Sequence, residues 1–456
     1  MVGRFRGLIT ALLFVPLAGS AEISSSFFGL AVSGNNGVLW PNKIAQPLAV
    51  STVRLWDSGT RWNQLEIGPG VYAWGPLDSM LLQAAANQQS VLYTFGGVPS
   101  FISSSQNDAV CAEGNGSCDA PTDLNPDGSG TNATFKAFVT DLMLHTGKQI
   151  KYFEAWNEVN NQQFWRGTAA QAVRMAYDAR TIIKTYNPSA VVLSPSTCPC
   201  NNTIFTAGKY TNSNVPNGMA YYLAATANIT GSPTGASVAD GVSIHPYVGN
   251  NPPENIASAI SATLSAMKSA GIKSLPLIIT EASWGPNNDV TGCPAGPPFS
   301  QACLDSAAAF IARTFAISAS SGVSAYYWYA WGNMGHGTLY NTATGLLYEP
   351  GVAYAQVRSW LAGATAVAPC NNFGPVYTCQ LSWPGQYKGL LVWDASQNCT
   401  SACTTSNFAV PAGFTTSHGL AGDPPVAVGS TIGIGIKPVL LTTFSCAVST
   451  PICGKK

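Results

Sequence analysis

Two glutamates, Glu158 and Glu281, are the residues of this chain best placed to do chemistry. Glu158 lies in Tyr-Phe-Glu-Ala-Trp-Asn-Glu-Val-Asn at 152–160, and Glu281 lies in Pro-Leu-Ile-Ile-Thr-Glu-Ala-Ser-Trp at 276–284. Each follows an apolar run that predicts a buried strand, so each carboxylate is expected where a strand gives way to a loop. In a barrel of parallel strands, such ends gather at one face, where two opposed carboxylates can break a glycosidic bond. The alternative for either residue alone is a structural role, as a helix cap or a loop charge.

Apolar runs alternate with helical patterns before residue 362. The runs predicted to be strands are 27–32, 52–56, 91–96, 151–156, 190–195, 241–246, 277–280 and 325–331. Between several of them, apolar residues recur at helical spacing, as in 135–143, 173–186 and 256–267. This alternation predicts an α/β fold, a (β/α)8 TIM barrel over residues 22–362.

The pattern changes near Gly363. Short alternating runs follow at 377–383, 389–393, 407–410, 431–436 and 438–444, separated by turns. They predict a smaller C-terminal antiparallel β-sandwich domain over 363–456. Because no low-complexity linker precedes these runs, we expect the β-sandwich to dock rigidly on the barrel.

The N-terminal residues predict export. Arg4 and Arg6 precede an apolar stretch at 8–17 and then small residues, which is typical of a signal peptide over 1–21. The stretch is too short for a membrane anchor, which takes about 20 residues. We therefore expect a secreted, extracellular protein with no membrane partner.

Cysteine spacing predicts disulfide bonds. The twelve cysteines fall in the close pairs 111/118, 198/200, 293/303, 370/379, 399/403 and 446/453, and the four histidines are not grouped with them. This favours local bridges over a metal site, and we expect no metal. Cys198 and Cys200 are the exception, because a bridge between residues two apart is strained; they either pair elsewhere or join each other weakly.

The composition gives no sign of nucleic acid or a membrane surface as a partner. Lys+Arg and Asp+Glu number 21 each, and 9% of residues are charged. The chain has no basic stripe for nucleic acid and no polybasic segment for a membrane surface. A chain with so few charges suits a neutral polymer as its substrate. Sequons at Asn115, Asn132, Asn201, Asn228 and Asn398 predict a glycoprotein if the host is eukaryotic.

Four motifs after predicted strands resemble those of the clan A glycoside hydrolases. They are Trp-Asn-Glu at 156–158, Ser-Ile-His-Pro-Tyr at 243–247, Thr-Glu at 280–281 and Trp-Tyr-Ala-Trp at 328–331. Within that clan, the chain over 22–445 is most similar to glycoside hydrolase family 39, through Arg-Leu-Trp-Asp at 54–57, Trp62, the stretch 70–78 and the C-terminal β-sandwich. Val159 departs from the family pattern, which usually has Pro there. The departure leaves the chemistry intact and the substrate open.

The resemblance implies a retaining mechanism without a cofactor. Glu158 would be the general acid and then the base, and Glu281 would be the nucleophile. Asn157 would donate a hydrogen bond to the sugar 2-hydroxyl, and Arg54 would keep Glu281 ionised by lowering its pKa. The alternatives are a helix-capping Asn157 and a structural ion pair at Arg54.

Other polar and aromatic residues are candidates for the same site. We expect the Tyr247 phenol within hydrogen-bond reach of Glu281 and His245 on the same wall, the alternatives being a packing tyrosine and a core histidine. Trp331 and Trp284 are candidate platforms for sugar faces, with Trp165 and Trp56 behind them; core packing is the alternative for each tryptophan.

The sequence therefore predicts a secreted, retaining glycoside hydrolase that cleaves an extracellular or cell-wall polysaccharide or oligosaccharide, acting as a monomer. An exo-acting glycosidase or a transglycosylase with the same carboxylates is an alternative. A carbohydrate-binding protein whose barrel has lost activity is another. The sugar and linkage depend on the loops at 103–131 and 285–303, whose shape the spacing of residues does not reveal.

Overall fold

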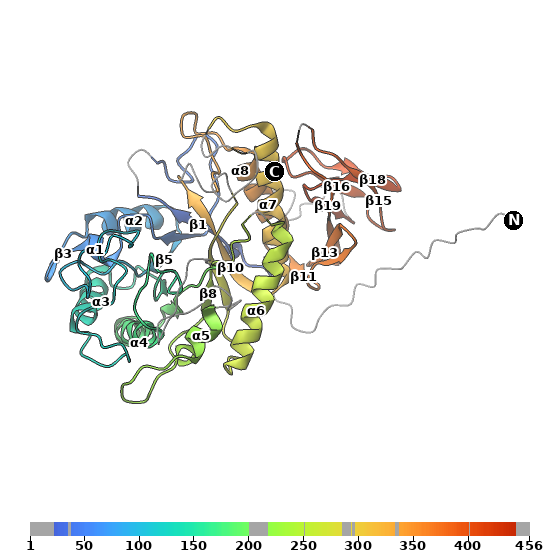
Figure 1. The fold of residues 1–456 in the computed structure, drawn as a ribbon. Helices are drawn as coiled ribbons and strands as arrows, with labels where there is room; N and C mark the ends of the chain where they lie inside the picture. Colours follow the sequence, from blue (N-terminus) through green and yellow to red (C-terminus); the bar gives the residue numbers. More distant parts are fainter. Residues whose placement is uncertain are drawn as a thin grey trace.

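Eight parallel strands form the centre of the molecule (Figure 1). The computed structural model describes residues 22–34, 38–199, 218–249, 251–284, 293, 297–332, 337–400 and 402–443; the predicted signal peptide lies outside these ranges. The strands are β1 (Phe28–Val32), β2 (Thr52–Leu55), β5 (Ser90–Thr94), β6 (Tyr152–Glu154), β7 (Val191–Leu193), β8 (Val242–Ile244), β9 (Leu277–Ala282) and β10 (Val323–Trp331).

The strands close into a barrel. Their order is β7-β6-β5-β2-β1-β10-β9-β8, and a parallel bridge between Leu193 and Gly241 joins β7 to the start of β8. Every predicted barrel strand is confirmed, and so is the TIM-barrel fold class. The strands are buried on both faces because helices cover their outer side, which explains their nearly continuous apolar runs.

Helices follow most of the strands. They are α2 (Gly75–Ala86), α3 (Ala133–Thr146), α4 (Ala169–Tyr186), α5 (Gly218–Ala224), α6 (Ile256–Ser269), α7 (Gln301–Ser320) and α8 (Glu349–Leu361). A short helix α1 (Trp62–Leu65) and a hairpin of β3 (Glu66–Gly68) and β4 (Val71–Tyr72) lie between β2 and α2 and were not predicted. In the described part of the chain, α7 alone is long and apolar enough to cross a membrane, but its apolar stretch is 67% buried in the fold.

The barrel interior is layered, because alternate side chains of each strand point inward. An apolar layer contains Leu92, Leu193, Ile278 and Tyr327. Two residues further along β5 and β9, the inward positions become polar, at Thr94 and Thr280. Fully buried polar side chains gather at this level, namely those of Arg54, Thr94, Glu154, His245 and Thr280.

The C-terminal region consists of two antiparallel sheets, as predicted. The larger contains β11 (Thr365–Ala366), β12 (Asn371–Phe373), β13 (Val376–Trp383), β14 (Tyr387–Asp394), β16 (Thr416–His418), β17 (Val426–Ala427) and β19 (Val439–Thr442). The smaller pairs β15 (Ser406–Ala409) with β18 (Thr431–Ile434). The five predicted runs all form strands. The sequence missed β11, β12, β16 and β17, which are only two or three residues long and show no alternation.

The larger sheet packs on both faces. Along β14, Leu390 and Val392 belong to the core under the small sheet, whereas Leu391 and Trp393 belong to the barrel core. The N-terminal segment also joins the two regions, since the Ile23 amide donates to the Ala364 carbonyl at 2.7 Å. Figure 1 shows the sheets beside α6 and α7. These contacts agree with the expectation of a docked domain.

Four of the predicted disulfides are formed, Cys111–Cys118, Cys293–Cys303, Cys370–Cys379 and Cys399–Cys403. The predicted Cys446–Cys453 bridge and the pairing of Cys200 fall outside the described residues. One sequon is unsuitable for a glycan, because Asn132 is fully buried and donates its side-chain amide to Asp178 at 2.8 Å. In this fold, Asn132 is therefore not accessible to a glycan.

Candidate active site

Glu158 lies just beyond β6, in a turn held by the neighbouring loop. Its backbone has φ 42°, and its amide donates to the Ser196 hydroxyl at 3.0 Å. The Asn161 side-chain amide donates to Oε2 at 2.9 Å, and Nδ1 of His245 lies 2.9 Å from Oε1. The strand and loop therefore hold the carboxyl group between an amide and an imidazole. Asn161 and Ser196 were not among the site residues predicted from the sequence.

Glu281 reaches the barrel mouth because β9 is irregular there. Strict alternation would place Glu281 on the face opposite to Thr280, but the register of β9 with β10 shifts between Ile279 and Ala282. Such a bulge re-aims a side chain. Arg54 then donates from Nη1 to Oε2 of Glu281 at 2.6 Å, and the Tyr247 hydroxyl donates to Oε1 at 2.8 Å.

The two glutamates are close neighbours across the mouth. One oxygen of Glu158, one oxygen of Glu281 and a ring nitrogen of His245 all lie within 4.8 Å of one another. Both carboxylates are nearly buried, with side chains 8% and 11% exposed. The structure thus brings together the predicted residues Glu158, Glu281, His245, Tyr247 and Arg54.

Arg54 connects this pair to a third carboxylate that the sequence analysis did not single out. Glu154 on β6 accepts from Arg54 Nη2 at 2.8 Å and Nε at 3.0 Å. It also accepts from Thr94 at 2.9 Å and Thr280 at 2.5 Å. Glu154 lies inside an apolar run at a position of inward parity, and a buried carboxylate requires a cation. The inward parity of Glu154, together with the inward position of Arg54 on β2, could have identified Glu154 from the sequence.

Asn157 is positioned by the same arginine. Arg54 Nη2 donates to the Asn157 Oδ1 atom at 2.6 Å. Because that contact uses the carbonyl oxygen, the amide nitrogen of Asn157 is the end that can donate elsewhere. This arrangement is compatible with the donor role proposed for Asn157. The contact is with the Arg54 side chain and not with a helix backbone, so it does not support the alternative of a helix cap.

Burial changes the ionisation of these groups. Burial alone would raise the pKa of Glu154, but Arg54 and His245 hold it well below the ordinary value. Burial alone would lower the pKa of His245, but Glu281, Glu154 and Glu158 raise it to about 9. His245 is therefore protonated at neutral pH, and both ring nitrogens donate, one toward Glu158 and the other to Thr280 at 3.1 Å.

The pKa of Glu281 departs from expectation. We expected its donors to lower it, but burial has the largest effect and raises it above the ordinary value. His245, Arg54 and the Tyr247 hydroxyl lower it, and the nearby charge of Glu158 raises it. The prediction of a lowered pKa is therefore wrong, because it left out the cost of removing a carboxylate from water.

Glu158, His245 and Glu281 have the donor types of a metal site. The contacts around these three residues do not suit a bound metal ion. Arg54 lies 2.6 Å from Glu281, and both nitrogens of His245 already contact Glu158 and Thr280. A cation bound here would stand beside a guanidinium group and compete with a protonated imidazole, so the residues do not fit a metal.

The predicted aromatic platforms have different surroundings. Trp331 is fully buried, stacks on Tyr340 at 4.2 Å between ring centroids and donates to the Leu39 carbonyl. It offers no face to a sugar, so that prediction is wrong. Trp165 and Trp56 are also buried.

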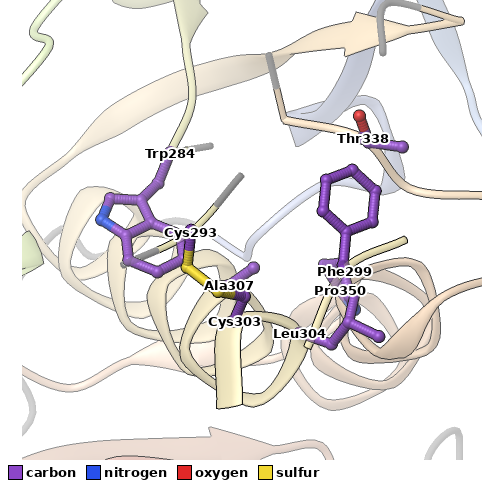
Figure 2. A pocket seen from close by; sticks show the side chains of 8 residues that line it. All are labelled: Trp284, Cys293, Phe299, Cys303, Leu304, Ala307, Thr338 and Pro350. Carbon is purple, nitrogen blue, oxygen red and sulfur yellow. A yellow bond between two sulfur atoms is a disulfide. The ribbon is translucent and has the colours of Figure 1, made fainter. Parts of the chain in front are cut away.

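Trp284 is half-buried and stacks one face on Phe310 at 5.5 Å. It lines a small apolar pocket of ≈ 20 Å³ with Phe299, Leu304 and the Cys293–Cys303 disulfide (Figure 2). The pocket is too small for a sugar ring. A role for Trp284 as a platform stays a prediction.

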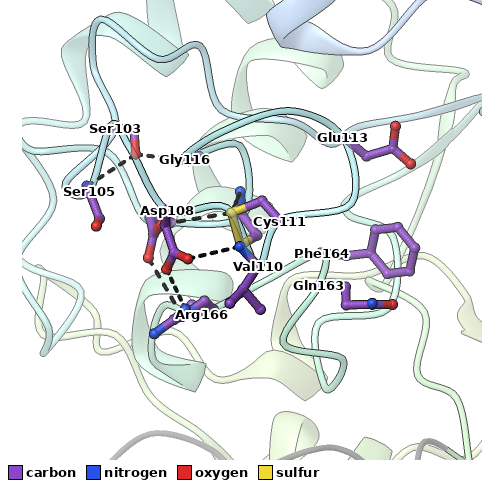
Figure 3. Close-up of a disulfide and its surroundings, with 12 residues drawn as sticks. Ser103, Ser105, Asp108, Val110, Cys111, Glu113, Gly116, Gln163, Phe164 and Arg166 are labelled. Atoms are coloured by element: carbon purple, nitrogen blue, oxygen red, sulfur yellow. Dashed lines mark hydrogen bonds and ion pairs between the residues drawn. A yellow bond between two sulfur atoms is a disulfide. The ribbon is translucent and has the colours of Figure 1, made fainter.

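The long loop after β5 is tied to the loop that follows Glu158. The Ala112 amide donates to the Gln163 carbonyl at 3.0 Å, and Arg166 forms an ion pair with Asp108. Figure 3 shows this ion pair beside the Cys111–Cys118 disulfide. A disulfide and an ion pair therefore fix one side of the barrel mouth.

Comparison with solved structures supports the same fold over nearly the whole chain. A family 39 glycoside hydrolase from the gut symbiont Bacteroides cellulosilyticus WH2 has a TM-score of 0.61 and 15% identity, covering 92% of this chain and 82% of that one. A family 39 β-xylosidase from Caulobacter crescentus has a TM-score of 0.59 and 15% identity, covering 93% and 98%. This chain therefore shares its fold with these two glycoside hydrolases.

Other members of this fold group agree. A family 30 endoxylanase from Clostridium papyrosolvens C71 has a TM-score of 0.56 and 15% identity, covering 93% of this chain and 96% of that one. No protein-family model matches the sequence, and no curated protein sequence matches it. The resemblance seen in the sequence motifs is therefore confirmed at the level of fold.

Proposed function

We propose that this protein is a retaining glycoside hydrolase, with Glu281 as the nucleophile and Glu158 as the acid and base. The observation that carries the proposal is the proximity of the two carboxylates, with oxygens within 4.8 Å. Retaining enzymes hold the two groups about 5–5.5 Å apart, whereas inverting enzymes leave about 6.5–9.5 Å for a water molecule. The spacing here favours direct attack on the sugar.

The contacts of the two carboxylates support different roles. Arg54 and Tyr247 both donate to Glu281, and such donors favour the ionised form that attacks the anomeric carbon. Glu158 would give its proton to the leaving oxygen as the glycosidic bond breaks. In the second step, Glu158 takes a proton from water, the water oxygen bonds to the anomeric carbon, and the bond to Glu281 breaks.

The charge of the cluster supports one protonated carboxyl group. Arg54 and protonated His245 contribute two positive charges, and Glu154, Glu158 and Glu281 are three carboxyl groups. Glu154 is ionised because its pKa is well below the ordinary value. The cluster is neutral when one further carboxylate is ionised and the third keeps its proton. Two carboxyl groups with unequal ionisation are what acid catalysis beside a nucleophile requires.

The names of the similar structures and the chain's own composition support a proposal for the substrate. The similar structures include enzymes named β-xylosidase and endoxylanase, and the chain carries few charges. We therefore propose a neutral extracellular or cell-wall polysaccharide or oligosaccharide as the substrate. The four disulfides support secretion, because such bonds persist in oxidising compartments.

Product stereochemistry tests the proposal. A panel of 4-nitrophenyl glycosides and plant polysaccharides would identify a substrate, and proton NMR would then follow the first product formed. We expect the anomeric configuration of the substrate to be kept. Inversion of the configuration would refute the double displacement, and binding of glycans without turnover would favour the carbohydrate-binding alternative.

A further inference from the structure

Tyr329 is a second tyrosine at the barrel mouth, and the proposed mechanism gives it no role. Along β10, Tyr326 and Trp328 point outward, because both rings contact Phe315 of α7. Tyr327 belongs to the apolar layer inside the barrel. By parity Tyr329, two residues closer to the carboxyl end and just where the register of β10 with β1 shifts, also faces the mouth. Consistent with this placement, Tyr329 adds to burial and to Glu281 in raising the pKa of Tyr247.

The phenol of Tyr329 fixes the carboxylate of Asp57. Its hydroxyl donates to Oδ2 of Asp57 at 2.5 Å, which joins the end of β10 to the loop after β2. Asp57 is one-third exposed, and its Oδ1 atom lies 3.6 Å from Arg61, beyond hydrogen-bond distance. A carboxylate has about four acceptor positions. Asp57 thus keeps acceptor capacity on its solvent side.

The order of the strands places Tyr329 on the strand next to that of the nucleophile, and the hydrogen bond from Tyr329 links Asp57 to this side of the mouth. β10 lies between β9, which carries Glu281, and β1, which adjoins β2. A sugar bonded to Glu281 is the glycone, and Tyr329 is on the neighbouring strand. We propose that Asp57, held by Tyr329, accepts a hydrogen bond from a hydroxyl group of the glycone and so determines which sugar is cleaved. This inference rests on the proposed glycoside hydrolase activity.

The charges around Asp57 extend the inference to a class of sugar. Arg61 forms ion pairs with both Asp57 and Glu113, so the three groups together carry one net negative charge. The catalytic cluster beside them is neutral when Glu158 is protonated. A uronate would bring a second negative charge to this side of the mouth. The pair Asp57–Tyr329 therefore selects a neutral glycone over the matching uronic acid.

Hydroxyl-by-hydroxyl kinetics test this assignment. The reference substrate is the 4-nitrophenyl glycoside with the highest kcat/KM, and monodeoxy analogues remove one glycone hydroxyl at a time. For the wild type, loss of the hydroxyl that Asp57 binds should lower kcat/KM by roughly ten- to a hundredfold, the range of a hydrogen bond to a charged group. Asp57→Ala should show a similar loss on the reference substrate and no further loss on that one analogue.

Two further variants separate recognition from folding. Tyr329→Phe removes only the hydroxyl that orients Asp57, and should weaken discrimination at the same hydroxyl by a smaller factor. Asp423→Asn, at an exposed position after β16, is the control and should behave as the wild type. Melting temperatures of all variants should stay near that of the wild type.

Clear results would overturn the inference. One is an Asp57→Ala variant within twofold of the wild type on the reference substrate, and another is an equal penalty for every deoxy analogue in both proteins. A wild type that prefers the uronate counterpart of its best neutral glycoside would overturn the charge argument. Failure of the proposed function itself would look different, because the wild type would then turn over no glycoside.

Discussion

Two of the molecule's buried arginine clusters differ in their balance of charge, one at the barrel mouth and one under the β-sandwich. At the interface, Arg313 and Glu254 form a two-point ion pair whose side chains are 6% and 8% exposed. The Trp393 indole also donates to Glu254 at 2.7 Å. At the mouth, Arg54 faces both Glu154 and Glu281. The interface matches one cation with one carboxylate, whereas the mouth has three carboxyl groups for two cations.

This difference separates a structural ion pair from a reactive one. The matched pair of Arg313 and Glu254 has no surplus carboxyl group that would exchange a proton. Its role is to dock one part of the fold on another. A surplus carboxyl group can hold a proton in the folded state, and such a proton would be available for transfer. We infer that the excess of carboxyl groups over cations maintains a proton donor at the barrel mouth. Variants at the two clusters can test this inference.

The largest predicted effect compares Glu281 with Glu254. Glu281→Ala should lower kcat by on the order of 10⁴-fold or more, because the covalent step is lost. Glu254→Ala should leave kcat within about threefold and lower the unfolding free energy by roughly 3 kcal/mol, because Arg313 is left buried without its partner. Steady-state kinetics and urea unfolding of both variants would check this. A catalytic loss in Glu254→Ala as large as in Glu281→Ala would break the comparison.

A second prediction concerns the number of carboxyl groups at the mouth. Glu154→Gln leaves two carboxyl groups for two cations, so the mouth should have no surplus carboxyl group to keep a proton. Without its proton, Glu158 cannot assist a poor leaving group, and kcat/KM on a natural oligosaccharide should fall by about 10²-fold, the scale of general acid catalysis. A 4-nitrophenyl glycoside needs less assistance and should lose less. An equal loss on both substrates would show that Glu154 is only a packing partner.

Tyr247→Phe should have a smaller effect. The fold should be retained, and kcat should fall by about ten- to a hundredfold, the scale of one lost hydrogen bond to a charged group worth about 1.5–3 kcal/mol. The structure supports this test, since the phenol lies 2.8 Å from Glu281. Tyr387→Phe, in the β-sandwich, is a matched control. Unchanged kcat in the Tyr247 variant would assign that tyrosine to packing.

The last of these predictions concerns stability, and not catalysis, as a function of pH. The pKa of His245 is about 9 in the folded protein against an ordinary value of 6.5, so the native state holds this proton more tightly. The stabilisation is complete below about pH 6.5 and is lost as pH rises through about 9, with a total of roughly 3 kcal/mol. Urea unfolding between pH 6 and 9.5 should show this decline in the wild type and in Glu254→Gln. A His245→Gln variant with the same decline would contradict the assignment.

The sequence predicted the barrel well, because each strand is a continuous apolar run and strand ends in such a barrel share one face. It also placed Arg54, His245 and Tyr247 near the two glutamates. It missed Glu154, whose importance depends on contacts between strands far apart in the sequence. It misplaced Trp331, because position at a strand end does not reveal that Tyr340 covers the ring. The pKa of Glu281 required knowledge of burial, which spacing alone does not provide.

The most direct test of the account is to trap the intermediate. An activated 2-deoxy-2-fluoro glycoside of the preferred sugar should form a stable ester, because the fluorine slows its hydrolysis. Peptide mass spectrometry should then find one added sugar on the peptide that contains Glu281, with no label in Glu281→Ala. A label on the peptide that contains Glu158 would contradict the assignment of roles. An unlabelled enzyme that turns over its substrate with inversion would contradict the mechanism.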